Sequence, residues 1–478
     1  GGWTGLALAS DSPAILERLT AVSRSGVYGA LVYGRPFRPL ARWAAERGVP
    51  LLPLNRARYI TDRDRDLCGL LRAIGLGRTV RSLEHRGRPG EAERYASGEE
   101  MKRYFSACPE AFEHAYALAM RVETGRIISP SFVFPRFRNL TEEASFALLR
   151  ARCYAGIAGR YGTPTPEVTA RLEYELGIIR TKGFSAYFLV VHDIVRRCPR
   201  TCGRGSSASS IVSYLLGITH VDPIRYDLFF ERFLNLGRTD PPDIDVDFPW
   251  DEREAAFAYV FETYAGRAGM VADHVTFADR ACIRESAKAL GLRGDGVERY
   301  AETWSDGETE GIPVDLLVAA RMIRGLPWYI GTHPGGVVIT PGPITDYTHV
   351  QPSPAGWPVI AWEKDAAEAA GLVKIDLLGN RSLGVLRDAL ELVNRRRSAE
   401  GLSGFRWESG ECLDDPATRR FIESGETLGI FYIESPATRQ LLRKMGTGDY
   451  PHLVVASSII RPAANGCIRE YLDRLGGK

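Results

Sequence analysis

Apolar and polar residues in the first 80 positions follow the pattern of an α/β module. Tyr28–Tyr33 and Val49–Leu54 are short and apolar, which predicts two buried strands. Between them, Pro36–Arg47 has the spacing of an amphipathic helix that ends at Gly48. A further helix is predicted from the Thr61-Asp62 cap to residue 74.

Beyond this module the pattern is mostly helical, with short interruptions. Residues 84–98 are rich in Gly, Arg and Glu and are predicted to form a loop. Helices are predicted over 107–124, 141–161, 165–179 and 278–290, and from Arg381 onward. Glycine-rich stretches lie at 203–210 and 331–336. The longest apolar runs, such as Tyr187–Val191, are strand-sized. They fall short of the roughly 18 residues of a membrane span, so no membrane segment is expected.

One segment, 241–248, alternates charged and apolar residues with period two. On a strand this alternation places three carboxylates on one face: Asp243, Asp245 and Asp247. The apolar side chains between them lie on the other face: Ile244, Val246 and Phe248. Clustered carboxylates repel one another unless a cation neutralises them, and hard divalent ions such as Mg²⁺ prefer oxygen ligands. The alternative is an exposed edge strand with a solvated acidic face. Periodicity does not identify which two of the three are ligands.

A second predicted strand, Gly371–Gly379, carries Lys374 and Asp376 on one face in an otherwise apolar sequence. A satisfied Lys–Asp pair at a strand edge is the simpler interpretation. If this strand lies next to the first acidic strand, however, a functional role for the Lys–Asp pair is favoured. Two-metal phosphoryl transfer uses carboxylates from adjacent strands and a lysine that faces the phosphates.

The third candidate is a turn of small residues that leads into the apolar segment Ile211–Gly217. It contains Gly203, Arg204, Gly205, Ser206 and Ser207. Such a turn lets backbone N–H groups approach an anion, and a following helix N-terminus adds favourable partial charge. Arg204 supplies a planar donor for phosphate. The turn does not match the Walker pattern or G-x-G-x-x-G. A tight structural turn with serine caps is the alternative.

Composition and charge restrict the class of protein without assigning a function. The 478 residues predict about three domains, and 45% hydrophobic with 25% charged residues excludes a disordered or disulfide-stapled chain. Lys and Arg number 61 against 59 Asp and Glu, so the whole chain gives no argument for nucleic acid. Eight scattered cysteines predict free thiols in a reducing cytoplasm, and eight scattered histidines argue against a histidine-built metal site.

Taken in order, these motifs resemble the palm of the bacterial C-family replicative polymerases, the DNA polymerase III α subunits. The segments that carry the resemblance are Gly183–Phe188, Gly203–Ser207, Tyr214–Thr219, Asp222-Pro223, Phe230–Asn235, Pro242–Phe248, His333–Ile339, Lys374–Gly379, Phe431–Ser435 and Ser457–Pro462. They cover nearly the whole chain. The His-Pro-Gly-Gly sequence at 333–336 is more similar to the error-prone accessory branch of the family.

The resemblance implies a role for particular residues. The family's catalytic, metal-binding aspartates correspond to Asp245, Asp247 and Asp376, which makes Asp243 a supporting carboxylate. The incoming triphosphate would contact Gly203, Arg204, Gly205, Ser206, Ser207 and Lys374, with Arg232 and Arg238 nearby. For these two arginines the alternative is an ion pair with the acidic strand. The implied cofactor is two Mg²⁺ ions, and the implied reaction is template-directed transfer of deoxynucleotides from dNTPs to a primer 3′-hydroxyl.

The resemblance also implies a multidomain fold that combines α/β and α+β parts. Residues 1–85 would be a partial polymerase-and-histidinol-phosphatase (PHP) module and 86–140 a connector. A nucleotidyltransferase-like, mixed-sheet palm would comprise 141–276 and 329–385, with a helical thumb at 277–328. Residues 386–478 would begin the helical fingers.

Duplex contacts and partners are further expectations. Arg280, Arg284 and Lys288 recur every four residues on one helix face, which suits phosphate contacts along primer–template DNA or a solvated basic face. A sliding clamp and replisome or mutasome proteins would bind regions of the family outside this chain. The expected role is DNA replication or translesion repair in the cytoplasm.

Two departures from the family qualify this picture. In the segment Leu54–Tyr59, Arg58 replaces the histidine that precedes the tyrosine in the family motif, so a PHP phosphoesterase is not expected. The chain has no initiating Met and ends inside the implied fingers, which suggests an internal piece of a longer polypeptide. The alternative function is a non-catalytic scaffold that binds DNA or a replisome partner.

Overall fold

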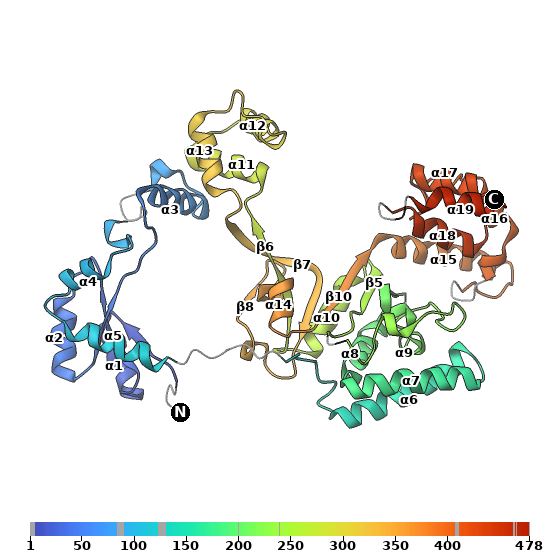
Figure 1. Cartoon of the computed structure of the whole chain (residues 1–478), viewed down its shortest axis with the longest axis horizontal. Coiled ribbons are helices and arrows are strands. Elements are labelled where there is room, and N and C mark those ends of the chain that lie inside the picture. Colours follow the sequence, from blue (N-terminus) through green and yellow to red (C-terminus); the bar gives the residue numbers. More distant parts are fainter. Residues whose placement is uncertain are drawn as a thin grey trace. The chain divides into compact units, whose positions relative to one another are not determined.

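The computed structural model describes residues 5–83, 90–122, 131–198, 200–238, 240–406, 411–461, 464 and 466–477 (Figure 1). The chain folds into two compact units. Unit 1 comprises Gly1–Ile128 and His274–Ile330, and unit 2 comprises Ser129–Asp273 and Gly331–Lys478. Each unit is therefore assembled from segments that are distant in the sequence.

The first part of unit 1 is a small parallel α/β layer. Its strands are β1 (Leu8–Ser10), β2 (Val27–Val32) and β3 (Leu51–Leu54), in the order β1-β2-β3. Its helices are α1 (Pro13–Val22), α2 (Arg38–Arg47), α4 (Gly98–Tyr104) and α5 (Glu110–Arg121). The predicted strands and the helix that ends at Gly48 are confirmed, and Gly48 adopts a left-handed conformation. Part of the expected loop, 84–89, lies outside the described residues. Helices α4 and α5 lie in the segment 86–140, which was expected to be a connector, and they share a hydrophobic core with this sheet.

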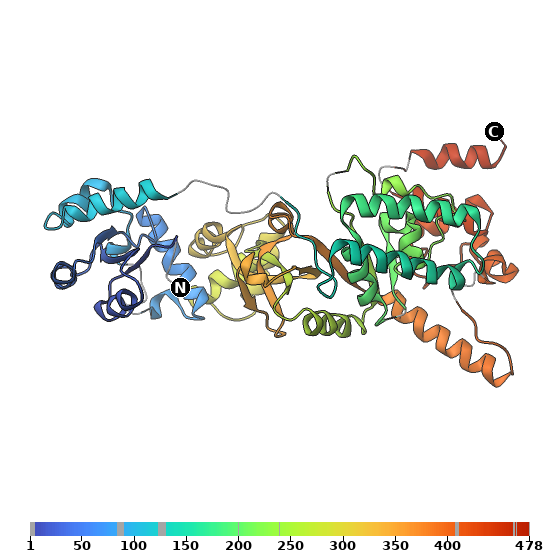
Figure 2. The same cartoon turned by 90° about the horizontal axis from the view of Figure 1, so that it is seen from below.

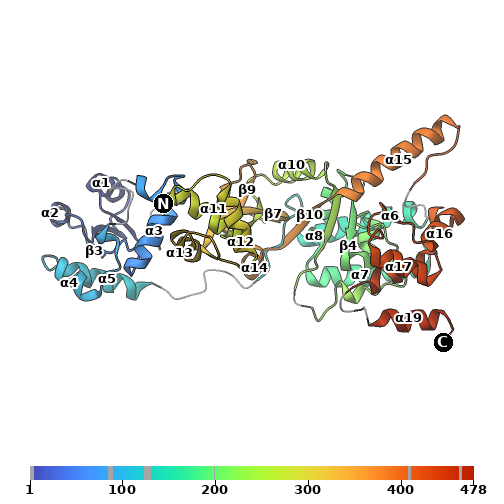
Figure 3. The same cartoon turned by 90° about the horizontal axis from the view of Figure 1, so that it is seen from above.

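The second part of unit 1 is a helical cluster. It contains α3 (Asp62–Gly75), α11 (Asp279–Leu290), α12 (Gly296–Ser305) and α13 (Val314–Ile323). Leu70 and Ala73 of α3 are buried together with Ile283 and Leu316. The predicted start of α3 is confirmed by a capping box between Thr61 and the third helical residue. Figure 3 shows α3 beside α11 and α13.

Unit 2 is organised around a seven-stranded mixed sheet, which confirms the mixed α/β character expected from the sequence. Its order is β4-β5-β10-β7-β6-β9-β8. The strands are β4 (Cys202–Arg204), β5 (Asp245–Pro249), β6 (Ala268–Thr276), β7 (Pro327–Ile339), β8 (Val350–Pro352), β9 (Pro358–Glu363) and β10 (Lys374–Asn380). The ends of β6 and β7 continue into unit 1. The glycine-rich stretch 331–336 belongs to β7.

Helices cover this sheet. They are α6 (Glu142–Arg160), α7 (Pro166–Lys182), α8 (Ser185–Val195), α9 (Ile211–Leu215), α10 (Arg253–Thr263) and α14 (Lys364–Ala369). Helices α6 and α7 run side by side (Figure 2) and are joined by a hydrogen bond from Arg150 to Glu173. The strand-sized apolar run Tyr187–Val191 lies in the helix α8. That helix is buried on nearly every side, so its sequence has no polar face to give a helical period.

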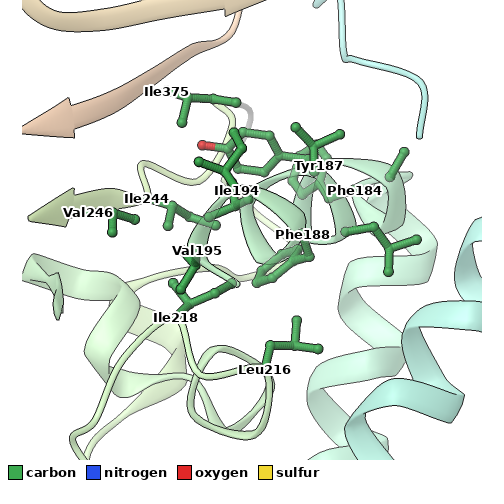
Figure 4. Close-up of a cluster of buried hydrophobic side chains, with 14 of the residues drawn as sticks. Phe184, Tyr187, Phe188, Ile194, Val195, Leu216, Ile218, Ile244, Val246 and Ile375 are labelled. Atoms are coloured by element: carbon green, nitrogen blue, oxygen red, sulfur yellow. The ribbon is translucent and has the colours of Figure 1, made fainter. Parts of the chain in front are cut away.

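The core of unit 2 lies between α8 and the two acidic strands. Figure 4 shows Ile194 and Val195 of α8 beside Ile244, with Val246 and, on β10, Ile375 in the same buried cluster. All five side chains are fully buried or nearly so. Since side chains alternate along a strand, this packing turns the intervening carboxylates toward the opposite face.

After β10 the chain is helical, as predicted. The helices are α15 (Arg381–Ala399), α16 (Pro416–Glu423), α17 (Pro436–Met445), α18 (Tyr450–Ile459) and α19 (Cys467–Leu475). Helix α15 continues directly from the end of β10 (Figure 3). The other helices form a small core of their own around Leu441, Leu442 and Met445.

Within the described ranges, no helix has both the length and the apolar character needed to cross a lipid bilayer. The seven cysteines in those ranges are all free thiols. Disulfide bonds therefore do not stabilise the described part of the structure.

Candidate metal centre and phosphate-binding turn

The two acidic segments form neighbouring parallel strands, β5 and β10. The register pairs Asp376 with Asp245, and Leu378 with Asp247. The apolar residues that alternate with the carboxylates of the segment 243–248 are fully buried: Ile244, Val246 and Phe248. The predicted alternation and the predicted proximity of the two strands are confirmed.

Three carboxylates meet at this pair of strands. Asp243, Asp245 and Asp376 each place one oxygen within 4.8 Å of the others. Their exposure is graded, because Asp243 is exposed, Asp245 is half-buried and Asp376 is only 8% exposed. Of the residues that the structure describes, these form the one group of three or more His, Cys, Asp and Glu residues that could hold a metal ion.

Asp247 lies on the same face of β5 but outside this group. Its Oδ2 accepts a hydrogen bond from the Asn380 side chain at 3.0 Å, and its Oδ1 lies 3.3 Å from Nε of Arg204. The structure therefore gives Asp243 the close position among the carboxylates, whereas the resemblance gives Asp247 that role. Sequence reasoning did not identify Asn380, since nothing in its local pattern marks it as a partner of Asp247.

The electrostatics of the group favour a cation. Burial, and then the neighbouring charge of Asp243, raise the pKa of Asp245, and Arg204 opposes this shift only in part. Oδ1 of Asp376 is buried without a hydrogen-bond partner among the described residues. Converging carboxylate oxygens, one of them buried and unsatisfied, are a donor set that suits a hard divalent cation.

His333 of β7 lies beside Asp376, with its Nδ1 3.9 Å from the unsatisfied Oδ1. That nitrogen already accepts hydrogen bonds from the backbone N–H groups of Gly335 and Gly336, at 3.2 and 2.7 Å. An accepting nitrogen carries no proton, so it does not donate to the carboxylate. Burial also lowers the pKa of His333, which favours this neutral ring.

Lys374 forms an ion pair with Oδ2 of Asp376. This is the simpler interpretation of the Lys–Asp motif, except that β10 is an interior strand of the sheet. Only 19% of the lysine side chain and 11% of the aspartate side chain are exposed. The ion pair is therefore largely buried, and Lys374 lines the same pocket as the three clustered carboxylates.

The turn 203–207 lies beside the carboxylates, as expected. Strand β4 is antiparallel to β5 and pairs Arg204 with Asp245. A side chain at position 203 would place its Cβ 2.4 Å from the carbonyl oxygen of Ile218, so only glycine fits there. Gly205 has a φ of 70°, which also favours glycine. Arg204 is exposed and forms ion pairs with Asp247 and, at 3.8 Å, with Asp245.

The expectation that a helix N-terminus adds to this turn is wrong. After a 3₁₀ turn, η3 (Gly205–Ser209), the five-residue helix α9 begins, and Glu175 already binds its first turn. The Glu175 carboxylate accepts from the N–H groups of Ile211 and Val212, at 3.1 and 3.3 Å, and from the Ser210 hydroxyl at 2.7 Å. A buried carboxylate thus satisfies the amides that an anion would need.

The serines of the turn are largely internal. The Ser207 hydroxyl is buried and donates to the carbonyl oxygen of Arg204, and the carbonyl oxygen of Ser206 accepts from Ser209. The groups that the turn exposes are Arg204 and Gly205. Any contact with phosphate would therefore be made mainly by the Arg204 side chain and the backbone next to it.

A pocket of about 330 Å³ opens over the acidic group. It is lined on one side by Asp243, Asp245 and Asp376, and by the cationic residues Lys374, Arg238 and Lys364. Lys364 begins α14 and was not predicted, because only the pairing of distant strands brings it here. Arg238 donates to the carbonyl oxygen of Phe233 at 2.9 Å. Arg232 is exposed in the 3₁₀ turn η4 (Phe230–Arg232) and is not one of the lining residues described.

Arg280, Arg284 and Lys288, the basic residues spaced by four on α11, belong to unit 1. Arg284 forms a two-pronged ion pair with Glu298, at 2.9 and 2.5 Å, and Lys288 pairs with Glu285 at 2.6 Å. Arg280 is exposed. Two of the three charges are therefore balanced locally, which favours the interpretation as a solvated face over phosphate contact.

Arg58, which stands where the resembled family motif has a histidine, forms an ion pair. Nε of Arg58 lies 2.9 Å from Glu93, and Asn55 bonds to the backbone of Arg94 and Ala96. An arginine committed to a glutamate is not a metal ligand.

Acidic residues on adjacent parallel strands, next to a Gly-Arg turn, are typical of proteins that bind phosphate esters with divalent cations. Comparison with known proteins identifies the family. The family model described as the bacterial DNA polymerase III alpha NTPase domain matches residues 147–379, which contain the whole acidic group. The model of the bacterial DNA polymerase III alpha subunit finger domain matches residues 382–478. The chain belongs to the family of bacterial DNA polymerase III α subunits.

Individual relatives agree with this assignment. An error-prone DNA polymerase of Nocardia farcinica is 36% identical over 447 residues, which cover 90% of this chain and 38% of that protein. One from Mycobacterium tuberculosis H37Rv is 35% identical over 92% of this chain and 41% of its own length. A DNA polymerase III subunit alpha of Halalkalibacterium halodurans is 32% identical over 91% and 41%. The chain thus spans about two fifths of the length of these relatives.

Proposed function

We propose that this chain provides the catalytic centre of a DNA-directed DNA polymerase. The enzyme adds deoxynucleotides from dNTPs to a primer 3′-hydroxyl, directed by a template, in DNA replication or translesion repair. The observation that carries the proposal is the acidic group on β5 and β10, which lies wholly within the matched polymerase domain. The printed names of the relatives, error-prone DNA polymerase and DNA polymerase III subunit alpha, support the same activity.

The metal centre in this proposal uses Asp245, Asp247 and Asp376 as catalytic ligands of two Mg²⁺ ions, with Asp243 beside them. The unsatisfied oxygen of Asp376 and the raised pKa of Asp245 support cation binding at this place. When bound, such ions lower the pKa of the attacking hydroxyl and neutralise charge on the leaving phosphates.

The cationic side chains bind and orient the triphosphate. Lys374 and Arg238 face the pocket, and Arg204 lies at its edge next to Asp245. Arg204 and Arg238 both carry planar guanidinium groups, and the exposed Arg204 suits two phosphate oxygens at once. Gly203 and Gly205 let the backbone of the turn come close to the phosphates, together with Ser206 and Ser207. Arg232 would act from the surface of the same region.

Template and primer complete the substrate. Sequence information comes from the template base, so the protein needs contacts with backbone and shape more than with base edges. We place primer–template DNA and dNTPs at unit 2. Contacts with a sliding clamp or other replisome or mutasome proteins are assigned to parts of the relatives that this chain does not span.

A second candidate is a scaffold that binds DNA or a replisome partner without catalysis. One observation favours it, since Asp376 is paired with Lys374 and Asp247 with Arg204, so part of the acidic charge is already balanced. On that account the carboxylates are structural and divalent cations bind weakly. The two candidates differ in whether Mg²⁺ and dNTPs support primer extension.

Primer extension by the wild type and by Asp245→Asn separates them. We expect extension by the wild type and a loss of about a hundredfold or more in the variant, because one anionic ligand is removed. Asp346→Asn, an exposed change in the same unit, is the matched control and should extend normally. Absence of extension by the wild type would favour the scaffold, and equal extension by Asp245→Asn would contradict its assignment.

A further inference from the structure

Asn380 stands at the junction between the catalytic strand and the first helix of the finger domain. It is the last residue of β10 and the N-cap of α15. Its side-chain oxygen accepts hydrogen bonds from the backbone N–H groups of Ser382 and Leu383, at 2.9 and 3.3 Å. These bonds satisfy two of the amides that a helix leaves without partners at its start.

The other end of the same amide reaches the acidic strand. Nδ2 of Asn380 donates to Oδ2 of Asp247 at 3.0 Å. The second oxygen of that carboxylate faces Nε of Arg204 at 3.3 Å, so both of its oxygens have a partner. One planar side chain therefore links the start of α15 to the orientation of Asp247, whose side chain is only 16% exposed.

Over its first three turns, helix α15 contacts the residues that follow β5 through one of its faces. Asn380, Gly384, Arg387 and Glu391 are spaced by four, three and four residues, which places them on one side of a helix. A Cβ at position 384 would lie 3.1 Å from Cδ1 of Trp250, so the helix passes close to the residue after β5. The first turn of α15 is thus held against the strand that carries the catalytic aspartates.

Ion pairs hold the same face of α15 further along the helix. Arg387 donates to both oxygens of Asp251, at 2.9 and 2.7 Å, and to Glu252 at 2.8 Å. One turn further, Glu391 lies 3.3 Å from Arg200. Only 14% of the Arg387 side chain is exposed. Because these bonds restrain the helix as a body, a shift of α15 would act on Asp247 through Asn380.

We propose that Asn380 is a positioning residue that couples the orientation of finger helix α15 to that of Asp247. Its catalytic consequence rests on the proposed polymerase function, whereas the coupling itself does not. The finger helix and the catalytic carboxylate then move together. An event that displaces α15, such as closure on a nucleotide, alters the geometry of the acidic strand.

The substitution Asn380→Asp separates this role from simple helix capping. Aspartate is as good an N-cap as asparagine, but it replaces the donor to Asp247 by a second carboxylate. The matched control is Asn394→Asp on the same helix. Asn394 also uses both ends of its amide, donating to and accepting from the backbone of Phe405, at 3.1 and 2.6 Å.

In single-turnover nucleotide incorporation, we expect Asn380→Asp to lower the rate by about ten- to a hundredfold, the range for a lost hydrogen bond to a charged group. The KM for dNTP and the urea midpoint should stay close to those of the wild type. Asn394→Asp should keep the wild-type rate. An unchanged rate in Asn380→Asp, or a loss of rate matched by an equal loss of stability, overturns the proposal.

A second measurement does not depend on polymerase activity. Hydrogen–deuterium exchange of the peptide that spans the first turns of α15 is followed in the wild type, Asp247→Ala and Asp243→Ala. Losing Asp247 frees the Asn380 side chain, so exchange there should be about tenfold faster, by the same hydrogen-bond magnitude. Asp243→Ala, two residues before β5 in the same acidic segment, removes a carboxylate that has no hydrogen bond to Asn380, so it should exchange like the wild type. Equal exchange in the wild type and Asp247→Ala overturns the coupling whether or not the protein extends a primer.

Discussion

Asp243, which precedes β5, and Asp247, which lies within it, flank Asp245 in the alternating segment, yet their surroundings differ. Asp243 is exposed and lies within ligand distance of the other two carboxylates, whereas Asp247 is held by Asn380 and Arg204. An exposed, unrestrained carboxylate adjusts to a cation but contributes little fixed geometry. A carboxylate held at both oxygens contributes orientation, which matters for the rate of the chemical step.

The substitutions Asp243→Asn and Asp247→Asn should therefore have different effects. Asp243→Asn is expected to raise the Mg²⁺ concentration for half-maximal primer extension by about tenfold, the effect of about 1.4 kcal/mol in cation binding, while the maximal rate is kept. Asp247→Asn is expected to lower the maximal rate by about a hundredfold. A Mg²⁺ titration of extension rate measures both. The reverse pattern would show that Asp243 is the catalytic residue.

The charge of Asp245 gives a prediction for stability and pH. Burial and Asp243 raise its pKa above the ordinary value, so without a cation the folded state binds this proton more tightly than the unfolded state. The stability contribution of this carboxyl therefore falls as pH rises from the unfolded pKa through the folded pKa, and stays low above it. In EDTA at neutral pH, Asp245→Asn should melt about 2 °C higher than the wild type. This difference should shrink toward acidic pH, and a lower melting temperature at neutral pH would contradict the account.

Among the helices and strands, the spacing of apolar residues and the capping residues predicted the features that depend on nearby sequence. The alternation in β5, the helix that ends at Gly48 and the cap at Thr61 all follow from residues within one turn or one strand. Helix α8 was missed because it is buried on nearly all sides, which removes the helical period. The role of Glu175 was also hidden, since its partners on α9 lie some 35 residues away in the sequence.

Glu175 should be among the most costly carboxylates to remove. It is fully buried, bonds to the start of α9 and accepts from Arg171 at 2.8 Å. Glu175→Ala removes the carboxylate partner of Arg171 and leaves two buried amides without their acceptor, so it should cost about 3 kcal/mol or more of unfolding free energy. The control is Glu173→Ala, also on α7, which removes only an exposed ion pair with Arg150 of α6. It should cost less than about 1 kcal/mol. Urea denaturation of both variants measures this, and equal losses would contradict the assigned role.

For the molecule as a whole, the order of motifs predicted which strands carry the site, but not what surrounds it. The neighbouring strands and the turn beside them followed from the family resemblance and the alternation. Lys364 and Asn380 could not be predicted, because only the folded chain brings the start of α14 and the end of β10 beside the acidic residues. Sequence also gave no sign that α3 shares a core with residues 277–326.

The division into two units predicts two thermal transitions. The acidic group lies wholly within unit 2, so a divalent cation that binds there stabilises that unit by mass action. Calorimetry with increasing Mg²⁺ should raise one transition and leave the other in place. Leu316→Ala, in the buried core of unit 1, should lower the transition that Mg²⁺ does not move. A cation effect on both transitions alike would contradict the placement of the site in unit 2.

The proposal that the carboxylates of β5 and β10 form a polymerase centre can be tested on a single residue. Single-nucleotide incorporation into a primer–template with Mg²⁺, by the wild type, Asp376→Asn and the exposed control Asp315→Asn, tests it most directly. The account predicts incorporation by the wild type and the control, and a loss of about a hundredfold or more in Asp376→Asn. Incorporation by Asp376→Asn at the wild-type rate would contradict it.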